Sequence, residues 1–124
     1  MEECVQQRKL LSREFQGCRE IFIALGDETR QQIFIALLEH EQIGMRVGEI
    51  TACTHLSRPA VSHHLRILKD AGLIRMHREG TRNYYYVDAG RKRWGQLKKL
   101  IDHVDHAVSS AEENDYPRFR EDED

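Results

Sequence analysis

One predicted helix carries side chains that could recognise nucleic acid. Ser57 can cap its start, and Pro59 suits its first turn, where a missing N–H costs no hydrogen bond. A helical wheel gathers four residues on one side: Pro59, Ser62, His63 and Arg66. A hydroxyl, an imidazole and a guanidinium near a helix start can reach base edges, while backbone amides there can meet phosphate. A merely solvated face stays the alternative, although Glu and Lys pairs are more typical of one.

A charged turn follows this helix directly. From Leu73 onward the sequence predicts two short strands, rich in β-forming residues, joined by a turn over 77–83. Arg78 and Arg82 flank the tip of the turn, and Thr81 lies between them. A charged tip is usually just solvated. Placed beside a recognition-type helix, however, it predicts a wing that contacts the phosphate backbone or the minor groove.

The distribution of charge supports a nucleic-acid partner. The chain of 124 residues has a formal net charge of −2, which by itself argues against such a partner. Residues 58–99 nevertheless contain 11 Lys and Arg against 3 Asp and Glu, a local charge of +8. The positive charge therefore coincides with the predicted helix, the wing and the segment after them, as expected for phosphate contacts.

The other side of the predicted recognition helix should hold it against a core. Val61, Leu65 and Leu68 fall within about 40° of one another on the wheel, with His64 at their flank. Gly72 suits a left-handed cap after the helix.

Two further helices should lie upstream and complete this core. One starts at Asp27 and is strongly apolar, with Ile33, Phe34, Ala36, Leu37 and Leu38 expected in the core. The other is short, runs from about Val47 to Leu56, and should turn Cys53 toward its inner side.

Long amphipathic helices at the two ends, 5–25 and 90–111, predict a dimerisation layer. Their apolar residues recur at spacings of three and four: Leu11, Phe15, Cys18, Phe22, Trp94, Leu97, Ile101, Val104 and Val108. Packing of the two helices within one subunit is the alternative. We favour the dimer because a winged helix gains specificity by reading two half-sites. Residues 1–111 would then form one domain, and the acidic residues 112–124 a disordered tail.

Composition excludes several classes of protein. No apolar run is long enough to span a membrane and the start does not resemble a signal peptide, so we expect a cytoplasmic protein. Cys4, Cys18 and Cys53 form no Cys-x-x-Cys pair, which argues against a disulfide framework. There is no Gly-rich phosphate loop and no nucleophile paired with a base, so we expect neither an enzyme nor a cofactor.

Two runs of sequence carry a family resemblance. LGDETRQQIFIALL, followed by LSRPAVSHHLRILKDAGLIRMHREGTRNYYYV, resembles the ArsR/SmtB family of winged-helix repressors over roughly Phe22 to His106. The resemblance implies a homodimeric repressor that leaves its operator when an inducer binds. It places recognition contacts on Arg58, Ser62 and His63, and wing contacts on Arg78 and Arg82. Arg58 stands where many relatives have Gln, and Arg suits guanine where Gln suits adenine.

The metal sites that the resemblance implies are incomplete in this sequence. Arg46 and Gly48 occupy the positions of a Cys-x-Cys pair in one family site, and neither binds a soft metal. His103 and His106 match half of a second site, whose other half here contains Lys92. Two ligands are fewer than zinc requires, so we predict no metal and keep these two histidines only as weak candidates.

The sequence as a whole predicts a mainly α (α+β) winged helix-turn-helix with about five helices and a two-stranded wing. Its expected partners are double-stranded DNA and a second copy of itself, and its expected function is repression at an inverted-repeat operator. A protein-interaction module on the same core, and a metal- or thiol-responsive sensor of the same family, stay open as alternatives.

Overall fold

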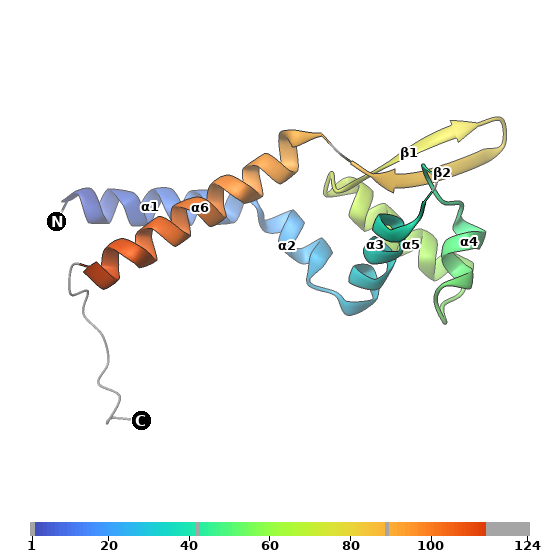
Figure 1. Cartoon of the computed structure of the whole chain (residues 1–124), viewed down its shortest axis with the longest axis horizontal. Helices are drawn as coiled ribbons and strands as arrows, with labels where there is room; N and C mark the ends of the chain where they lie inside the picture. Colours follow the sequence, from blue (N-terminus) through green and yellow to red (C-terminus); the bar gives the residue numbers. More distant parts are fainter. Residues whose placement is uncertain (1, 42, 89, 114–124) are drawn as a thin grey trace, which may run out of the picture.

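The computed structural model describes residues 2–41, 43–88 and 90–113. Within these ranges the chain forms six helices and one antiparallel hairpin, in the following order: α1 (Glu2–Gly17), α2 (Arg19–Leu25), α3 (Glu28–Glu39), α4 (Val47–Ala52), α5 (Arg58–Asp70), β1 (Ile74–Glu79), β2 (Arg82–Val87) and α6 (Arg91–Glu113). Figure 1 shows a compact part built from α2–α5 and the hairpin, with α1 and α6 projecting from it side by side. No helix in these ranges combines the length and apolar character needed to cross a membrane. The predicted mainly α winged helix-turn-helix is confirmed.

Local capping interactions explain where the core helices begin. The Asp27 carboxylate accepts a hydrogen bond from the Arg30 backbone N–H at 2.9 Å and starts α3. The Ser57 hydroxyl accepts one from the Ala60 N–H at 3.3 Å and starts α5. Gly72 follows α5 with a φ of 77°, the left-handed conformation that glycine adopts most easily. The three predicted helix caps, at Asp27, Ser57 and Gly72, are confirmed.

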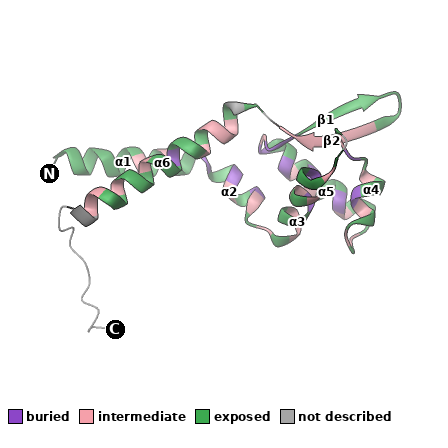
Figure 2. Ribbon diagram, in the orientation of Figure 1, coloured by how far each residue is buried: buried purple, intermediate pink, exposed green. Residues whose placement is uncertain are grey.

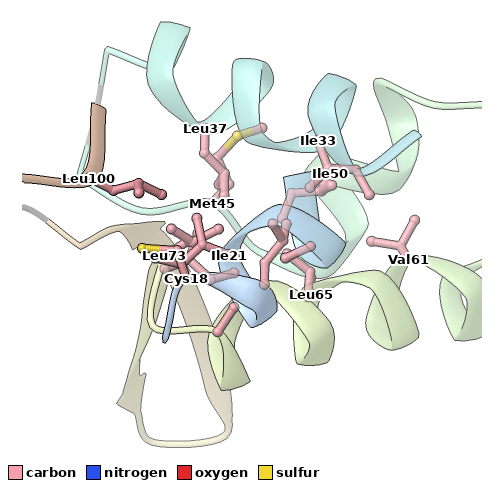
Figure 3. Close-up of a cluster of buried hydrophobic side chains, with 14 residues drawn as sticks. Cys18, Ile21, Ile33, Leu37, Met45, Ile50, Val61, Leu65, Leu73 and Leu100 are labelled. Carbon is pink, nitrogen blue, oxygen red and sulfur yellow. The ribbon is translucent and has the colours of Figure 1, made fainter. Parts of the chain in front are cut away.

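The core lies between α2, α3, α4 and α5 and the base of the hairpin. Val61, Leu65 and Leu68 are completely buried, as the helical wheel predicts. They pack with buried side chains from the other elements, shown in Figure 3: Cys18, Ile21, Ile33, Leu37, Met45, Ile50, Leu73 and Leu100. Burial of each large aliphatic side chain contributes about 1.5–3 kcal/mol before the cost of ordering the chain.

The hairpin is joined to this core at its base. Ile74 pairs with Val87 at that end, and Ile74 is buried. The loop before α4 adds a short bridge, in which the backbones of Met45 and Tyr85 exchange two hydrogen bonds of 2.8 Å. At the far end Glu79 pairs with Arg82, leaving a two-residue turn. Gly80 adopts the positive φ that such tight turns require.

The N-terminal helix differs from the prediction of one continuous helix over 5–25. It is divided at Cys18, whose φ of −98° and ψ of 8° lie outside the helical range. The Cys18 N–H bonds to the Phe15 carbonyl, a tighter turn than the α-helical one, and the preceding Gly17 has low helix propensity. The break lets α2 turn Ile21 and Ala24 into the core while α1 runs away from it.

Two predictions of burial are wrong. Leu38 is 58% exposed because only one side of α3 faces the core, and that side carries Ile33 and Leu37. Cys53 is exposed because α4 ends at Ala52. Cys53 is the residue that caps α4, so the inward-facing row that includes Ile50 stops before it.

Candidate nucleic-acid interface

Helix α5 presents to solvent the polar face that the wheel predicts. Arg58, Pro59, Ser62, His63 and Arg66 are all exposed, whereas the opposite side of the helix is buried. The cap at Ser57 fixes where the first turn begins. Helical periodicity then determines which residues are exposed once those on the buried side are known. A rigid helix with one face fully anchored can hold these groups at fixed positions against a groove.

Helix α4 supports α5 in the arrangement of a helix-turn-helix. The two helices pack against each other, and Ile50 of α4 belongs to the same core. In the turn between them, the Thr54 hydroxyl accepts a hydrogen bond from the Leu56 backbone N–H at 3.2 Å. This short polar link shapes the turn and leaves the outer face of α5 uncovered.

The hairpin extends beside α5 and carries exposed cations at its tip. Arg78, Thr81 and Arg82 are all exposed. Arg78 Nε donates a hydrogen bond of 2.9 Å to the Gly80 carbonyl, so this arginine also stabilises the turn. Arg78 pairs across the strands with Asn83, whereas Arg82 pairs with Glu79, which places the two arginines on opposite faces of the hairpin.

A surface hollow joins the start of α5 to the hairpin tip. Its volume is about 340 Å³, and it is lined by Arg46, Val47, Gly48, Arg58, Thr81, Arg82 and Asn83. The structure therefore brings Arg58, Thr81 and Arg82 together, although 22 positions or more separate the first from the other two. The other predicted contact residues do not line this hollow and lie exposed on α5 and β1.

The electrostatic setting of this surface favours an anion. Among the described residues, Arg58, Arg66 and Arg82 have no carboxylate within salt-bridge distance, although all three are exposed. An exposed arginine without an acidic partner can bind phosphate without first breaking an ion pair.

Arg30 of α3 links its own helix to α2 and α5 through its side chain. Arg30 donates hydrogen bonds to the Ala24 carbonyl at 2.8 Å and the Ile23 carbonyl at 3.0 Å, and its Nη1 lies 3.3 Å from His64 Nδ1. An arginine can only donate, so His64 Nδ1 must accept and the ring must be neutral.

The ionisation of this junction agrees with its geometry. Burial lowers the pKa of His64, and the Arg30 and His63 charges lower it further, while Asp27 opposes them. The pKa of Asp27 is lowered chiefly by the hydrogen bond from the Arg30 backbone. Both the hydrogen bond from Arg30 and the lowered pKa therefore favour the neutral form of His64.

Sequence reasoning missed Arg46 and Arg30 as parts of this region. Arg46 was considered only as a position where a metal ligand is absent, and it lies more than 10 residues before α5. Its place in the hollow depends on how α4 packs, which no local pattern reveals. Arg30 carried one available signal, namely a cation three residues after a capping aspartate.

The weak metal candidates lie elsewhere, on α6. His103 Nδ1 is 2.8 Å from both carboxylate oxygens of Glu14 on α1, to which an Nδ1–H donates, and His106 is exposed. Within the ranges that the structure describes, no three His, Cys, Asp or Glu side chains form a group that could hold a metal ion. Cys4 is exposed near the N-terminus, and Cys18 is buried.

Comparison with known proteins places this surface in context. The model of the arsR family of bacterial regulatory proteins matches residues 27–76, which include α3, α4 and α5. An uncharacterized HTH-type transcriptional regulator of Methanocaldococcus jannaschii is 37% identical over 91 residues, which are 73% of this chain and 98% of that protein. A transcriptional repressor SmtB homolog of Synechocystis is 33% identical over 100 residues, which are 81% of this chain and 73% of that protein.

A third relative and two solved structures agree. The transcriptional repressor SdpR of Bacillus subtilis is 40% identical over 55% of this chain and 72% of that protein. The crystal structure of an ArsR family transcriptional regulator, RHA00566, superposes with a TM-score of 0.63 at 22% identity, covering 74% of this chain and 90% of that one. The transcriptional repressor BigR of Xylella fastidiosa gives 0.57 at 16% identity, covering 77% and 90%. At these identities the two structures support the fold.

Proposed function

This chain belongs to the ArsR family of bacterial regulatory proteins, and we propose that it is a transcriptional repressor that binds double-stranded DNA as a homodimer. Two copies related by a two-fold axis would read the two halves of an inverted-repeat operator. A signal that remains to be identified would release the repressor from it. The family and its relatives are regulators, which speaks against an enzymatic role.

The observation that carries this proposal is the exposed face of α5 together with the hairpin tip. Ser62, His63 and Arg66 would enter the major groove and contact base edges, with Pro59 against the groove wall. Arg78, Thr81 and Arg82 would contact the backbone beside them. Arg58, at the start of α5, shares a hollow with the hairpin tip and can contact a base or a phosphate.

The homodimer is supported by the apolar residues that α1 and α6 leave uncovered. Figure 2 shows α1 mostly exposed, and α6 with exposed stretches alternating with intermediate ones. Phe15 is 57% exposed, Ile101 and Val108 are each 54% exposed, and Val104 is 38% exposed. Apolar rows of this kind on two adjacent helices are characteristic of an interface between subunits.

The remaining predicted interface residues divide into two groups. Leu11, Phe22, Trp94 and Leu97 are half-buried and keep surface for a second copy. Cys18 is 2% exposed in the single chain, so almost none of its surface is left to bury at an interface, and we leave it out. The proposed dimer layer spans α1 and α6, and α6 continues to Glu113. Of the predicted acidic tail, residues 114–124 lie outside the described residues.

Binding can be tested by a mobility shift on the DNA upstream of the protein's own gene. Wild type should retard this fragment more strongly than a shuffled duplex. Arg58→Ala combined with Arg82→Ala should weaken binding and lower the slope of log K against log[salt] by about 0.9 or more, where about 0.9 is the value for one lost phosphate contact. Lys98→Ala on α6 serves as the control. An unchanged affinity and slope in the double variant would contradict the proposed reading surface.

A further inference from the structure

Three arginines from three separate elements converge on the hollow beside α5. Arg46 lies immediately before α4, Arg58 is the first residue of α5, and Arg82 begins β2 at the hairpin tip. All three are exposed. Arg46 has no role in the contact set proposed for DNA, and yet it lines the same space as two residues that do. Figure 1 shows α4 next to the hairpin, at the end of the molecule opposite the free ends of α1 and α6.

The acidic groups near this hollow do not neutralise it. Arg46 Nε is 3.9 Å from Glu49 Oε1, and both side chains are almost half exposed, so this ion pair is weak. Glu49 is also occupied by the Arg46 backbone N–H, which donates to it at 3.1 Å. Arg58 and Arg82 have no acidic partner among the described residues. Glu79 faces Arg82 across the hairpin but lies within salt-bridge distance of His77 instead. Among the described residues, the three arginines of the hollow therefore have only one weakly paired carboxylate, that of Glu49.

The walls of the hollow leave room for a ligand. Gly48 lines it, and a Cβ atom added there would come within 3.7 Å of Arg58 Nη2. A glycine at this helical position costs stability relative to alanine, but it keeps the space beside the guanidinium free. Asn83 also lines the hollow, and its Oδ1 atom is enclosed without a hydrogen-bond partner among the described residues. This oxygen can only accept a hydrogen bond and a phosphodiester has none to donate, so the arginines and not Asn83 would hold an anion in the hollow.

We propose that this hollow binds one backbone phosphate of the DNA, and that Arg46 is a phosphate-contacting residue together with Arg58 and Arg82. The inference rests on the proposed DNA binding and adds a residue and a site to it. A phosphodiester has one negative charge and two free oxygens, which suit the planar forks of arginines. Because the three arginines come from the residue before α4, from α5 and from the hairpin, one phosphate would fix the recognition helix and the wing on the same DNA strand.

The test measures the affinity of the full-length protein for two duplexes over a series of NaCl concentrations. One duplex is the upstream fragment and the other is its shuffled version. Arg46→Ala should weaken binding to both by a similar factor, about tenfold at low salt, and lower the slope by up to about 0.9, the value for one phosphate, because Arg58 and Arg82 would still contact the same phosphate. The matched control is Arg19→Ala, an exposed arginine on α2 that does not line the hollow. It should leave the slope unchanged.

A second variant fills the hollow without removing an arginine. Gly48→Glu places a carboxylate among the three guanidinium groups. The midpoint of thermal unfolding should stay the same or rise, while affinity for both duplexes should fall at least tenfold. The opposite directions of these two effects separate a blocked site from a damaged fold.

The outcomes distinguish this inference from the proposed function. If wild type and Arg19→Ala bind DNA while Arg46→Ala and Gly48→Glu bind with wild-type affinity and slope, the hollow holds no phosphate and the inference is overturned. The proposed function as a DNA-binding repressor would not be affected by that result. If wild type itself retards neither duplex at low salt, the proposed function fails and the inference fails with it.

Discussion

Residues 19–88 and the two terminal helices differ in where their apolar side chains are buried. The segment 19–88 provides almost all of the core, including completely buried residues from α2, α3, α4, α5 and β1. Over the described residues, α1 buries no side chain at all and α6 buries only Leu100. The central unit is therefore stabilised within one chain, and in the proposed homodimer the terminal helices would complete their burial against a second copy.

The two regions also differ in charge. The central unit presents exposed arginines at the outer face of α5 and at the hairpin tip, while α1 and α6 present rows of exposed apolar residues. One surface therefore suits a polyanion and the other suits an apolar partner. Four predictions, ordered by the expected size of the effect, test this difference between the two regions.

The largest effect should come from the core of the central unit. Leu65 is completely buried, so Leu65→Ala should lower the free energy of unfolding by about 3 kcal/mol through lost burial and a residual cavity. Denaturant unfolding followed by circular dichroism measures this loss. Leu38→Ala is the matched control, since Leu38 is 58% exposed and should cost much less. Equal losses at both positions would mean that burial in the single chain does not determine stability here.

The next effect should appear in assembly. Ile101→Lys combined with Val108→Lys should raise the dimer dissociation constant about 100-fold, or about 2.7 kcal/mol, because two charges would be buried at the interface. Sedimentation velocity over a concentration series measures it. Leu38→Lys provides an equally exposed apolar position in the central unit and should leave dimerisation unchanged. A dimer lost only in the Leu38 variant would move the interface from α6 to α3.

A smaller effect is expected at the start of the recognition helix. Ser57→Ala removes the hydroxyl that caps α5 and should cost about 1 kcal/mol of stability. Dimerisation should not change, since the cap lies in the central unit. Ser62→Ala, an exposed hydroxyl inside the same helix, should leave stability nearly unchanged and instead affect DNA binding. A shift in the dimer dissociation constant of Ser57→Ala would show that the two regions are coupled more tightly than the structure suggests.

The smallest effect concerns pH. The folded pKa of His64 lies below its ordinary value of 6.5, chiefly through burial, so the unfolded chain binds more protons as the pH falls. This residue therefore favours unfolding as the pH drops through about 6.5, and its contribution stops changing below the folded pKa. Protonation would also remove the acceptor for Arg30. Denaturant unfolding from about one pH unit above 6.5 to about one and a half units below it measures this loss.

The controls for this pH dependence are two histidine variants. His64→Gln should flatten the loss of stability on acidification, whereas His106→Gln, an exposed histidine on α6, should retain it. The same acid-induced loss in all three proteins would assign it to another group.

Much of the central unit follows from patterns within a few residues. The buried row of Val61, Leu65 and Leu68 and the exposed face opposite it are both determined by helical periodicity once the Ser57 cap is placed. The turn at Gly80 needs only a residue that tolerates a positive φ. These features depend on contacts within one or two turns of the chain, and such contacts can be predicted from the local sequence.

The errors occur where burial depends on distant segments. Leu38 lies on an apolar helix, but α3 is covered on one side only. Gly17 is a weak local signal for the break at Cys18, but the turn of α2 into the core depends on its packing against α3 and α5, and a continuous apolar row does not indicate it. The contact of Arg30 with His64 joins residues 34 positions apart. Neither helical periodicity nor capping rules contain information about such neighbours.

The sequence by itself determined the family, the two-helix and hairpin unit, and which face of α5 is free to read DNA. Only the tertiary structure decided that Arg46 joins Arg58 and Arg82 around one hollow, and that α1 has no burial of its own. The physical reason is the range of the interactions. Periodicity, caps and turns are set by neighbours along the chain, whereas the meeting of three arginines and the exposure of a helix face depend on how separate elements pack.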